Sequence, residues 1–429
     1  MKSARRSDGV AAIAAACAVL VAAAACSERE GSSASSKDGG ERDADARAGQ
    51  LRPDAGRACE GSAQVEPIRE LDLLFVIDTS ITMAQEQSWL AEQVPALLQR
   101  LAPDESGRTL HLGVVSGDLG ADPSLSDLDE GRCELPGDDG RLQRDGNTTL
   151  EGASVTCSEQ PTPFLTHQAG RDAIASTASD LACLVRRGTG GCGHEQQLES
   201  ALRAVWPGAG EREPIGGPAA GQGDGENAGF LEPESDALLA VIALSDEDDC
   251  SHPDAHFLWP SSRLDRDDPA DARLLTQGLR ARCALNPDAL YPLERYLDGW
   301  RALRGGRAER VFFAALVGAP PDAVGPEVLA GTDFDDAADR ERFYDELLAH
   351  PQMQIAVDER GTDDPSDDAI RPSCFTDSGT SSPPARFTEL ARAFGGYGLV
   401  QSLCGDDYAA AVEAIAARID QLMAAPGCR

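Results

Sequence analysis

The chain has 429 residues, with 73 acidic and 38 basic side chains and a formal net charge of −35 at pH 7. An acidic balance of this size argues against nucleic acid as a partner and against electrostatic attachment to anionic lipid. Behind the amino-terminal segments lies a body of about 370 residues, which is long for a single core. We therefore expect either two domains or one domain with large insertions, and the pattern of strands and helices favours insertions.

The amino end has the pattern of an export signal. Basic residues at positions 2, 5 and 6 precede an uncharged apolar run over residues 10–25. A basic start followed by about 16 apolar residues is typical of a signal peptide, whereas a transmembrane helix needs roughly 20 apolar residues. We therefore expect residues 1–25 to direct export and to be removed.

Cys26 follows Ala23, Ala24 and Ala25 at the end of this run. The segment resembles a bacterial lipobox, which implies that Cys26 carries a lipid. Ser27 follows the cysteine directly, and a Ser at that position resembles the sorting signal of outer-membrane lipoproteins. The predicted location is therefore the cell envelope, and within it the outer membrane, on its periplasmic or its outer face. Plain cleavage near Ala25, without a lipid, is the alternative. Residues 26–58 are rich in Ser, Gly, Ala and charge, which predicts a disordered tether.

The body, residues 59–429, contains ten cysteines. An even number in an exported chain favours five disulfides, whereas the wide spacing and the lack of a CxxC pair disfavour a zinc site. The sequence alone leaves the connectivity open. Pairing neighbours in chain order predicts Cys133–Cys157, Cys183–Cys192, Cys250–Cys283 and Cys374–Cys404. This leaves the pair Cys59–Cys428 to join the two ends of the domain.

Apolar runs along the body predict strands that are buried on both faces of a sheet. They cover 71–77, 110–116, 237–244 and 311–317, with a short strand at 397–401. Helical spacing of apolar residues predicts helices over 84–101, 169–187, 194–206, 269–284, 287–304, 385–394 and 406–425. Polar or turn-rich segments at 120–166, 207–230 and 351–384 are predicted to be insertions, and disulfides are expected to staple those that contain cysteines. The alternation predicts an α/β fold with a doubly wound, Rossmann-like, mostly parallel sheet and helices on both faces.

Sheets of this kind bind ligands at the carboxyl ends of their strands. Asp78, Ser80 and Thr82 follow the first predicted strand in the motif DTSIT, and they alternate, so their oxygens face the same way. Carboxylate and hydroxyl oxygens suit Mg²⁺, Ca²⁺ or Mn²⁺ better than zinc. In the other interpretation, Ser80 and Thr82 only cap the helix that begins at residue 84.

These segments resemble the von Willebrand factor A (vWA) family, whose metal-ion-dependent adhesion site uses a DxSxS motif, a separate Thr and a separate Asp. DTSIT supplies Asp78, Ser80 and Thr82, RGTGGCGHEQQLESAL supplies Thr189, and ALSDEDDC supplies Asp246, with Asp248 as the alternative register. Together with GVVSGDLG, these segments resemble a branch of secreted bacterial lipoproteins with this domain. The resemblance implies a vWA-like fold, a divalent cation, Mg²⁺ before Mn²⁺ or Ca²⁺, and a partner protein whose Asp or Glu carboxylate completes the coordination.

Two other functions fit the sequence less well. A haloacid-dehalogenase-like phosphatase also places Asp after a buried strand, but its DxDxT motif has a second Asp where this chain has Ser80, and the only lysine after residue 25 is Lys37. A metal-independent scaffold of the cell envelope is the alternative from the structural class. Other catalytic motifs are absent, so we expect adhesion or protein–protein interaction and not catalysis. The pairs His194–Glu195 and His252–His256 are the candidates for a histidine-based site, and we interpret His252 and His256 as surface histidines without a role in zinc binding.

Overall fold

The computed structural model describes residues 66–121, 133, 135–150, 153–157, 160–208, 213–358, 361, 368–375, 379–405 and 407–424. The chain divides into two units, Met1–Gly56 and Arg57–Arg429. The predicted signal peptide, the lipidation site Cys26, the tether and the predicted pair Cys59–Cys428 all lie outside the described residues. Among the helices that are described, none is long and apolar enough to cross a membrane.

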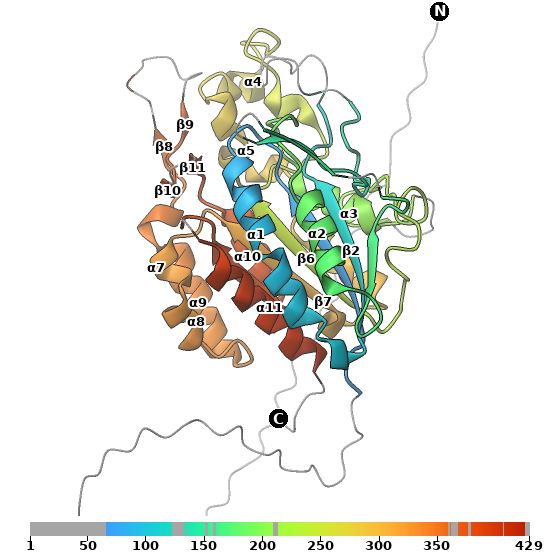
Figure 1. Ribbon diagram of the computed structural model, residues 1–429. Coiled ribbons are helices and arrows are strands. Elements are labelled where there is room, and N and C mark those ends of the chain that lie inside the picture. Colours follow the sequence, from blue (N-terminus) through green and yellow to red (C-terminus); the bar gives the residue numbers. More distant parts are fainter. Residues whose placement is uncertain are drawn as a thin grey trace, which may run out of the picture. The chain divides into compact units, whose positions relative to one another are not determined.

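A six-stranded sheet forms the centre of the second unit, in the order β12-β7-β6-β1-β2-β5 (Figure 1). Neighbouring strands are parallel, except that β5 runs antiparallel to β2. The fold is therefore a mixed α/β fold with a mostly parallel sheet, as the apolar runs predict. The strands are β1 (Glu70–Ile77), β2 (Thr109–Ser116), β5 (Leu165–Gln168), β6 (Leu238–Ser245), β7 (Val311–Val317) and β12 (Gly398–Ser402).

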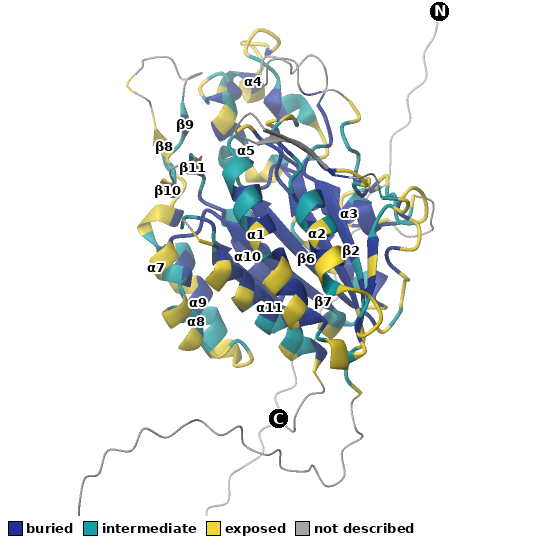
Figure 2. Ribbon diagram, viewed as in Figure 1, coloured by how far each residue is buried: buried dark blue, intermediate teal, exposed yellow. Residues whose placement is uncertain are grey.

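Helices cover both faces of this sheet, and the central strand β1 shows why its sequence is almost continuously apolar. Leu73 and Phe75 belong to one buried cluster, and Leu74 and Val76 belong to the other. Figure 2 shows the strands buried between the helical layers. The first cluster includes residues of α1 (Ala84–Leu101), α2 (Ile174–Leu184) and α11 (Ala409–Met423); the second includes residues of α3 (Gln197–Val205), α6 (Glu294–Leu303), α9 (Ala337–Ala349) and α10 (Ala385–Ala393).

Three parts of the fold differ from the sequence-based expectation. The edge strand β5 begins inside the predicted insertion 120–166 and joins the main sheet. The helix predicted over 269–284 is split into α4 (Pro269–Leu274) and α5 (Arg282–Leu285), and Gly278 between them has an extended backbone with ψ of 139°. The backbone of Asp368 passes so close that a Cβ at Gly278 would lie 1.9 Å from its carbonyl oxygen. After β7 the chain also forms α7 (Pro321–Val324), α8 (Pro326–Ala330) and α9 (Ala337–Ala349), none of which is among the helices predicted from the sequence.

The described parts of two predicted insertions form small hairpins away from the main sheet. In the first, β3 (Asn147–Leu150) pairs with β4 (Ala153–Thr156). In the last, β8 (Val357–Asp358) pairs with β9 (Ala369–Ile370), and β10 (Cys374–Phe375) pairs with β11 (Thr380–Ser381). The β10–β11 hairpin is joined to the end of the main sheet by a backbone hydrogen bond, in which Ser382 N donates to Asp246 O at 2.8 Å.

Four disulfides lie within the described residues. Cys250–Cys283 and Cys374–Cys404 confirm the predicted pairs. The predictions Cys133–Cys157 and Cys183–Cys192 are wrong, since the bonds are Cys133–Cys192 and Cys157–Cys183. The physical reason is that α2 folds back onto the hairpin segment, where Gly146 leaves room beside both the Cys157 sulfur and the Cys183 carbonyl. Pairing by proximity in the sequence fails where a helix returns the chain to an earlier segment.

Candidate metal centre

The centre lies where the two middle strands end. β1 and β6 run parallel with Ile77 opposite Leu244, so the residues that follow them emerge side by side. Asp78 N donates to Leu244 O at 3.0 Å, and Asp78 and Asp246 are both buried, with exposed fractions of 0% and 3%. Adjacent parallel strands therefore bring together two carboxylates that are 168 positions apart in the chain.

The DTSIT loop is folded by its own polar groups. One Asp78 oxygen, Oδ1, accepts a hydrogen bond from Ser80 N at 2.8 Å, and the other, Oδ2, accepts one from Ser245 Oγ at 2.5 Å. The hydroxyls of Ser80 and Thr82 are 3.4 Å apart, and hydrogen bonding by Thr82 acts to lower the pKa of Asp246. The structure thus brings Asp78, Ser80, Thr82 and Asp246 into one cluster, and Ser80 and Thr82 provide no side-chain cap at the start of α1.

Thr189 lies in the glycine-rich loop beside this cluster. Gln87 of α1 ties the loop in place, since its Nε2 donates to both Asp78 O (2.8 Å) and Gly188 O (2.9 Å), and its Oε1 accepts from Gly188 N. Thr189 itself lines a polar cavity of about 420 Å³, together with Thr79, Asp118, Asp138, Arg187, Gly188, Gly190 and Gly191. The glycine-rich loop therefore lies next to the acidic cluster, while direct ligation of a metal by Thr189 stays a prediction.

Glu195 is a further member of the cluster that the sequence motifs did not indicate. Its Oε1 accepts from both the backbone N and the hydroxyl of Thr79, at 2.9 and 3.0 Å. Its Oε2 is buried without a hydrogen-bond partner, next to Gly117, where a Cβ would lie 2.1 Å away. The available signal was its position directly after the glycine-rich loop, but a charged residue there is also normal on an exposed helix start.

Burial and mutual repulsion dominate the electrostatics of these carboxyl groups. Burial raises the pKa of Asp78, and it raises the pKa of Glu195 and Asp246 well above the usual range, with the charge of Asp78 adding to the increase in both. Among the described residues, no Arg, Lys or His forms an ion pair with any of the three. One oxygen of Asp246, Oδ1, is also buried without a hydrogen-bond partner. An unpaired buried carboxylate is costly, so these donors fit a divalent cation, which would supply the missing positive charge.

The neighbouring acids after β6 have other partners, which favours Asp246 over Asp248 as the candidate ligand. Asp248 accepts from Arg386 N at 3.0 Å, at the start of α10, and burial raises its pKa to about 7. Asp249 accepts from Leu198 N at 2.9 Å and pairs with the Arg386 guanidinium at 3.1 Å. Asp246 is therefore the better candidate for the ligand, and Asp248 and Asp249 hold α3 and α10 against the loop.

The histidines are arranged differently from the expectation. His256 pairs with Asp271 at 3.1 Å, whereas His252 lies against His194, with 3.4 Å between His252 Nδ1 and His194 Nε2. His194 is buried and His252 is partly buried, and burial lowers the pKa of both, that of His194 to about 3. The His194 ring is therefore neutral at pH 7.

Comparisons with known proteins give little further information. No family model and no curated protein matches the chain. One solved structure to which it is similar is the human COPII-coat protein Sec24c, at a TM-score of 0.23 and 11% sequence identity. That alignment covers 62% of this chain and 28% of the Sec24c chain. Similarity at this level does not define a family for the chain.

Proposed function

We propose that this chain is an exported lipoprotein, anchored through Cys26, whose vWA-like domain binds a divalent cation and, through it, a partner protein. The predicted ligands are Asp78, Ser80, Thr82, Thr189 and Asp246. One observation carries the proposal: two buried carboxylates lie side by side at the ends of β1 and β6, and one of them has an oxygen without any partner.

The strand order supports a doubly wound, vWA-like sheet. From β1 the chain continues to β2 on one side, and it later returns to β6 on the other side. In open α/β sheets, ligands bind in the crevice at the carboxyl ends of the strands where the order reverses. Asp78 and Asp246 follow β1 and β6, the two strands at this reversal.

The donor set also explains how a partner would bind. Two carboxylates and a few hydroxyls leave a Mg²⁺ ion with positions that water must fill. A carboxylate from a partner protein can replace one of these waters. In a chain of net charge −35, the ion would be the local positive charge that attracts an acidic side chain.

The test is calorimetric titration of the oxidised full-length chain in detergent with Mg²⁺ and Mn²⁺. We expect saturable binding of one ion, weakened on the order of 100-fold by Asp78→Asn or Asp246→Asn, because each change removes a negative ligand while it keeps the shape. The matched control is Asp248→Asn, which alters the same residue type in the same loop but leaves an oxygen for Arg386 N, and should bind as the wild type does.

These measurements also distinguish metal-mediated adhesion from the scaffold and the phosphatase. If folded wild-type protein binds neither ion, the metal mechanism is wrong and the metal-independent scaffold is favoured. If metal binds, a chelator must abolish capture of any envelope partner, whereas a scaffold would keep its partner. Turnover of a phosphate ester that is lost in Asp78→Asn would instead identify the phosphatase.

A further inference from the structure

Another cavity lies at the opposite end of the sheet from the candidate metal centre. Its volume is about 510 Å³, which is within the range of small-molecule sites. Its walls include segments at the amino ends of the strands, since Ile68 precedes β1, Arg310 precedes β7 and Tyr397 precedes β12. Asp78 follows the other end of β1, so the two sites lie roughly 30 Å apart along the sheet, at about 3.3 Å per strand residue.

Four arginines from different parts of the fold line this cavity. They are Arg301 of α6, Arg310 directly before β7, Arg340 of α9 and Arg418 of α11. Three acids also line it: Asp335 pairs with Arg418 at 2.8 Å, whereas Glu66 and Glu309 are exposed and form no ion pair within the described residues. The wall therefore has a net positive charge, although the whole chain has a net charge of −35.

Two of these arginines are held in place by backbone carbonyls. Arg340 Nη1 donates to Phe334 O at 2.8 Å, and Arg418 Nε donates to Gly396 O at 3.1 Å. Gly395 has a φ of 66°, and a Cβ at Gly396 would lie 3.3 Å from Arg418 Nη2. The glycine pair thus lets the guanidinium groups approach the turn closely, and Arg340 and Arg418 form a fixed part of the wall.

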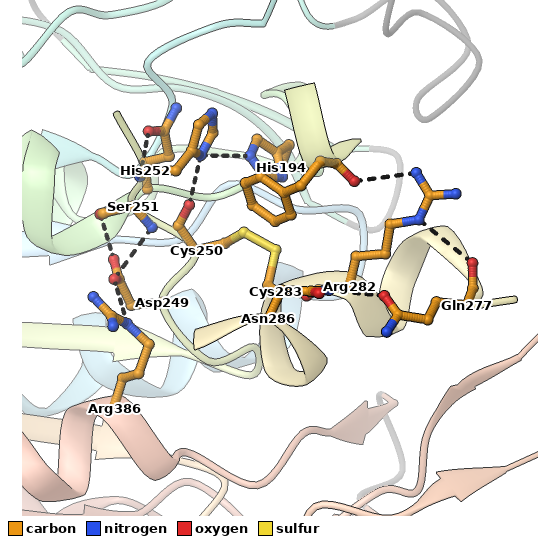
Figure 3. The surroundings of a disulfide bond; sticks show 12 residues. His194, Asp249, Cys250, Ser251, His252, Gln277, Arg282, Cys283, Asn286 and Arg386 are labelled. Atoms are coloured by element: carbon orange, nitrogen blue, oxygen red, sulfur yellow. Dashed lines mark hydrogen bonds and ion pairs between the residues drawn. A yellow bond between two sulfur atoms is a disulfide. The ribbon is translucent and has the colours of Figure 1, made fainter. Parts of the chain in front are cut away.

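The other two arginines, Arg301 and Arg310, lack an acceptor. Elsewhere in the fold, Arg386 pairs with Asp249 and Arg282 donates to backbone carbonyls, as Figure 3 shows. Within the described part of the chain, the side chains of Arg301 and Arg310 form no ion pair and donate no hydrogen bond. The Nε of both residues and Arg310 Nη1 are buried, whereas Arg310 Nη2 is neither buried nor hydrogen-bonded and can reach the cavity. A partly buried charge without a partner is costly, so these two groups fit an anion that supplies negative charge and acceptor oxygens.

We propose that this cavity binds the phosphate group of an organic ligand, with Arg301 and Arg310 as its main contacts. A guanidinium presents paired N–H donors that match two phosphate oxygens. Two such groups balance a phosphate monoester, whose charge is about −1.5 to −2 at pH 7. Phe394 and Tyr397 also line the cavity, and the Arg301 guanidinium lies over the Phe394 ring, 5.4 Å from its centroid. These rings would pack against the carbon part of the ligand, which is either a soluble phosphate ester or a lipid headgroup.

The test is calorimetric titration of the full-length chain in a neutral detergent with phenyl phosphate, in buffer freed of divalent cations by a chelating resin. We expect one saturable site, which Arg301→Met or Arg310→Met weakens on the order of 10- to 100-fold, because each change removes hydrogen bonds to a charged group. Arg342→Met is the matched control, since Arg342 is on the same helix as Arg340 but its side chain is 62% exposed. This control should bind as the wild type does. Asp246→Asn should also leave binding unchanged, so the result does not depend on the proposed metal site.

Further ligands define the chemistry of the site. Benzoate should bind more weakly than phenyl phosphate, because a carboxylate has one negative charge and two oxygens. Glycerophosphoglycerol, which is the headgroup of phosphatidylglycerol without its acyl chains, distinguishes the two sources of phosphate. Tighter binding of this headgroup than of phenyl phosphate identifies a lipid, and weaker binding identifies a soluble ester.

Circular dichroism checks that each variant is folded. Because the Arg301 side chain donates no hydrogen bond within the described residues, Arg301→Met should fold even if Arg310→Met does not. Three results would overturn the proposal: no saturable binding of phenyl phosphate to the folded wild type, tighter binding of benzoate than of phenyl phosphate, or an equal loss of affinity in Arg342→Met and Arg301→Met.

Discussion

Replacing Arg295 by Met should lower the free energy of unfolding by about 3–5 kcal/mol, because it leaves a buried carboxylate without its main counter-charge. Arg295 of α6 is completely buried and makes two hydrogen bonds to Glu199 of α3, at 2.7 and 2.9 Å. Its remaining donors reach the carbonyls of Ile215, Gly217 and Pro218. One side chain thus joins two helices and anchors the segment predicted to be the 207–230 insertion.

Urea-induced unfolding of the oxidised chain measures this effect. The control is Arg100→Met, since Arg100 and its partner Glu413 are 44% and 57% exposed, and exposed pairs contribute at most about 1 kcal/mol. Adding Glu199→Gln to Arg295→Met should recover part of the loss, because the unpaired charge is then gone. A loss below about 1 kcal/mol for Arg295→Met would show that this ion pair does not hold α3 and α6 together.

The second large effect links metal, pH and stability at the candidate centre. The pKa of Asp246 is raised, first by burial and then by the charge of Asp78, so the folded chain binds this proton more tightly than the unfolded chain does. The contribution of Asp246 to stability is therefore fully present below its unfolded pKa of about 3.9 and is lost as the pH rises through its folded pKa. A bound cation would reverse this loss by favouring the ionised carboxylate.

In chelator at pH 8, Asp246→Asn should therefore be more stable than wild type by about 1–3 kcal/mol. At pH 5 the difference should shrink, and in saturating Mg²⁺ the order should reverse, because only wild type gains the free energy of metal binding. Thermal unfolding at both pH values measures the difference in stability between wild type and Asp246→Asn. The buried histidines titrate in both proteins, so their effect on stability cancels in this difference. The exposed Asp236→Asn is the control, and equal stabilities of wild type and Asp246→Asn under all these conditions would contradict the predicted charge cluster.

Local sequence was sufficient for the elements whose environment is uniform along the chain. The run over 71–77 is apolar at nearly every position because β1 is covered on both faces, and this property can be read without knowing the neighbours. The same reasoning holds for β6 and β7. The DTSIT motif also has a local signal, since Asp78 must follow a strand, and the short spacing keeps Ser80 and Thr82 close to it.

Other features depend on contacts between distant segments, and only the tertiary structure could decide them. The partners of Cys133 and Cys183 follow from the way α2 returns to the hairpin segment, and no spacing rule contains that path. Glu195 enters the acidic cluster because Gly117, on the loop after β2, leaves space for its carboxylate. His252 meets His194 and not His256, because the loops after β6 and before α3 meet beyond the end of the sheet. Hydrophobic periodicity records the environment of each residue, whereas the pairing of polar side chains depends on which segments the fold brings together.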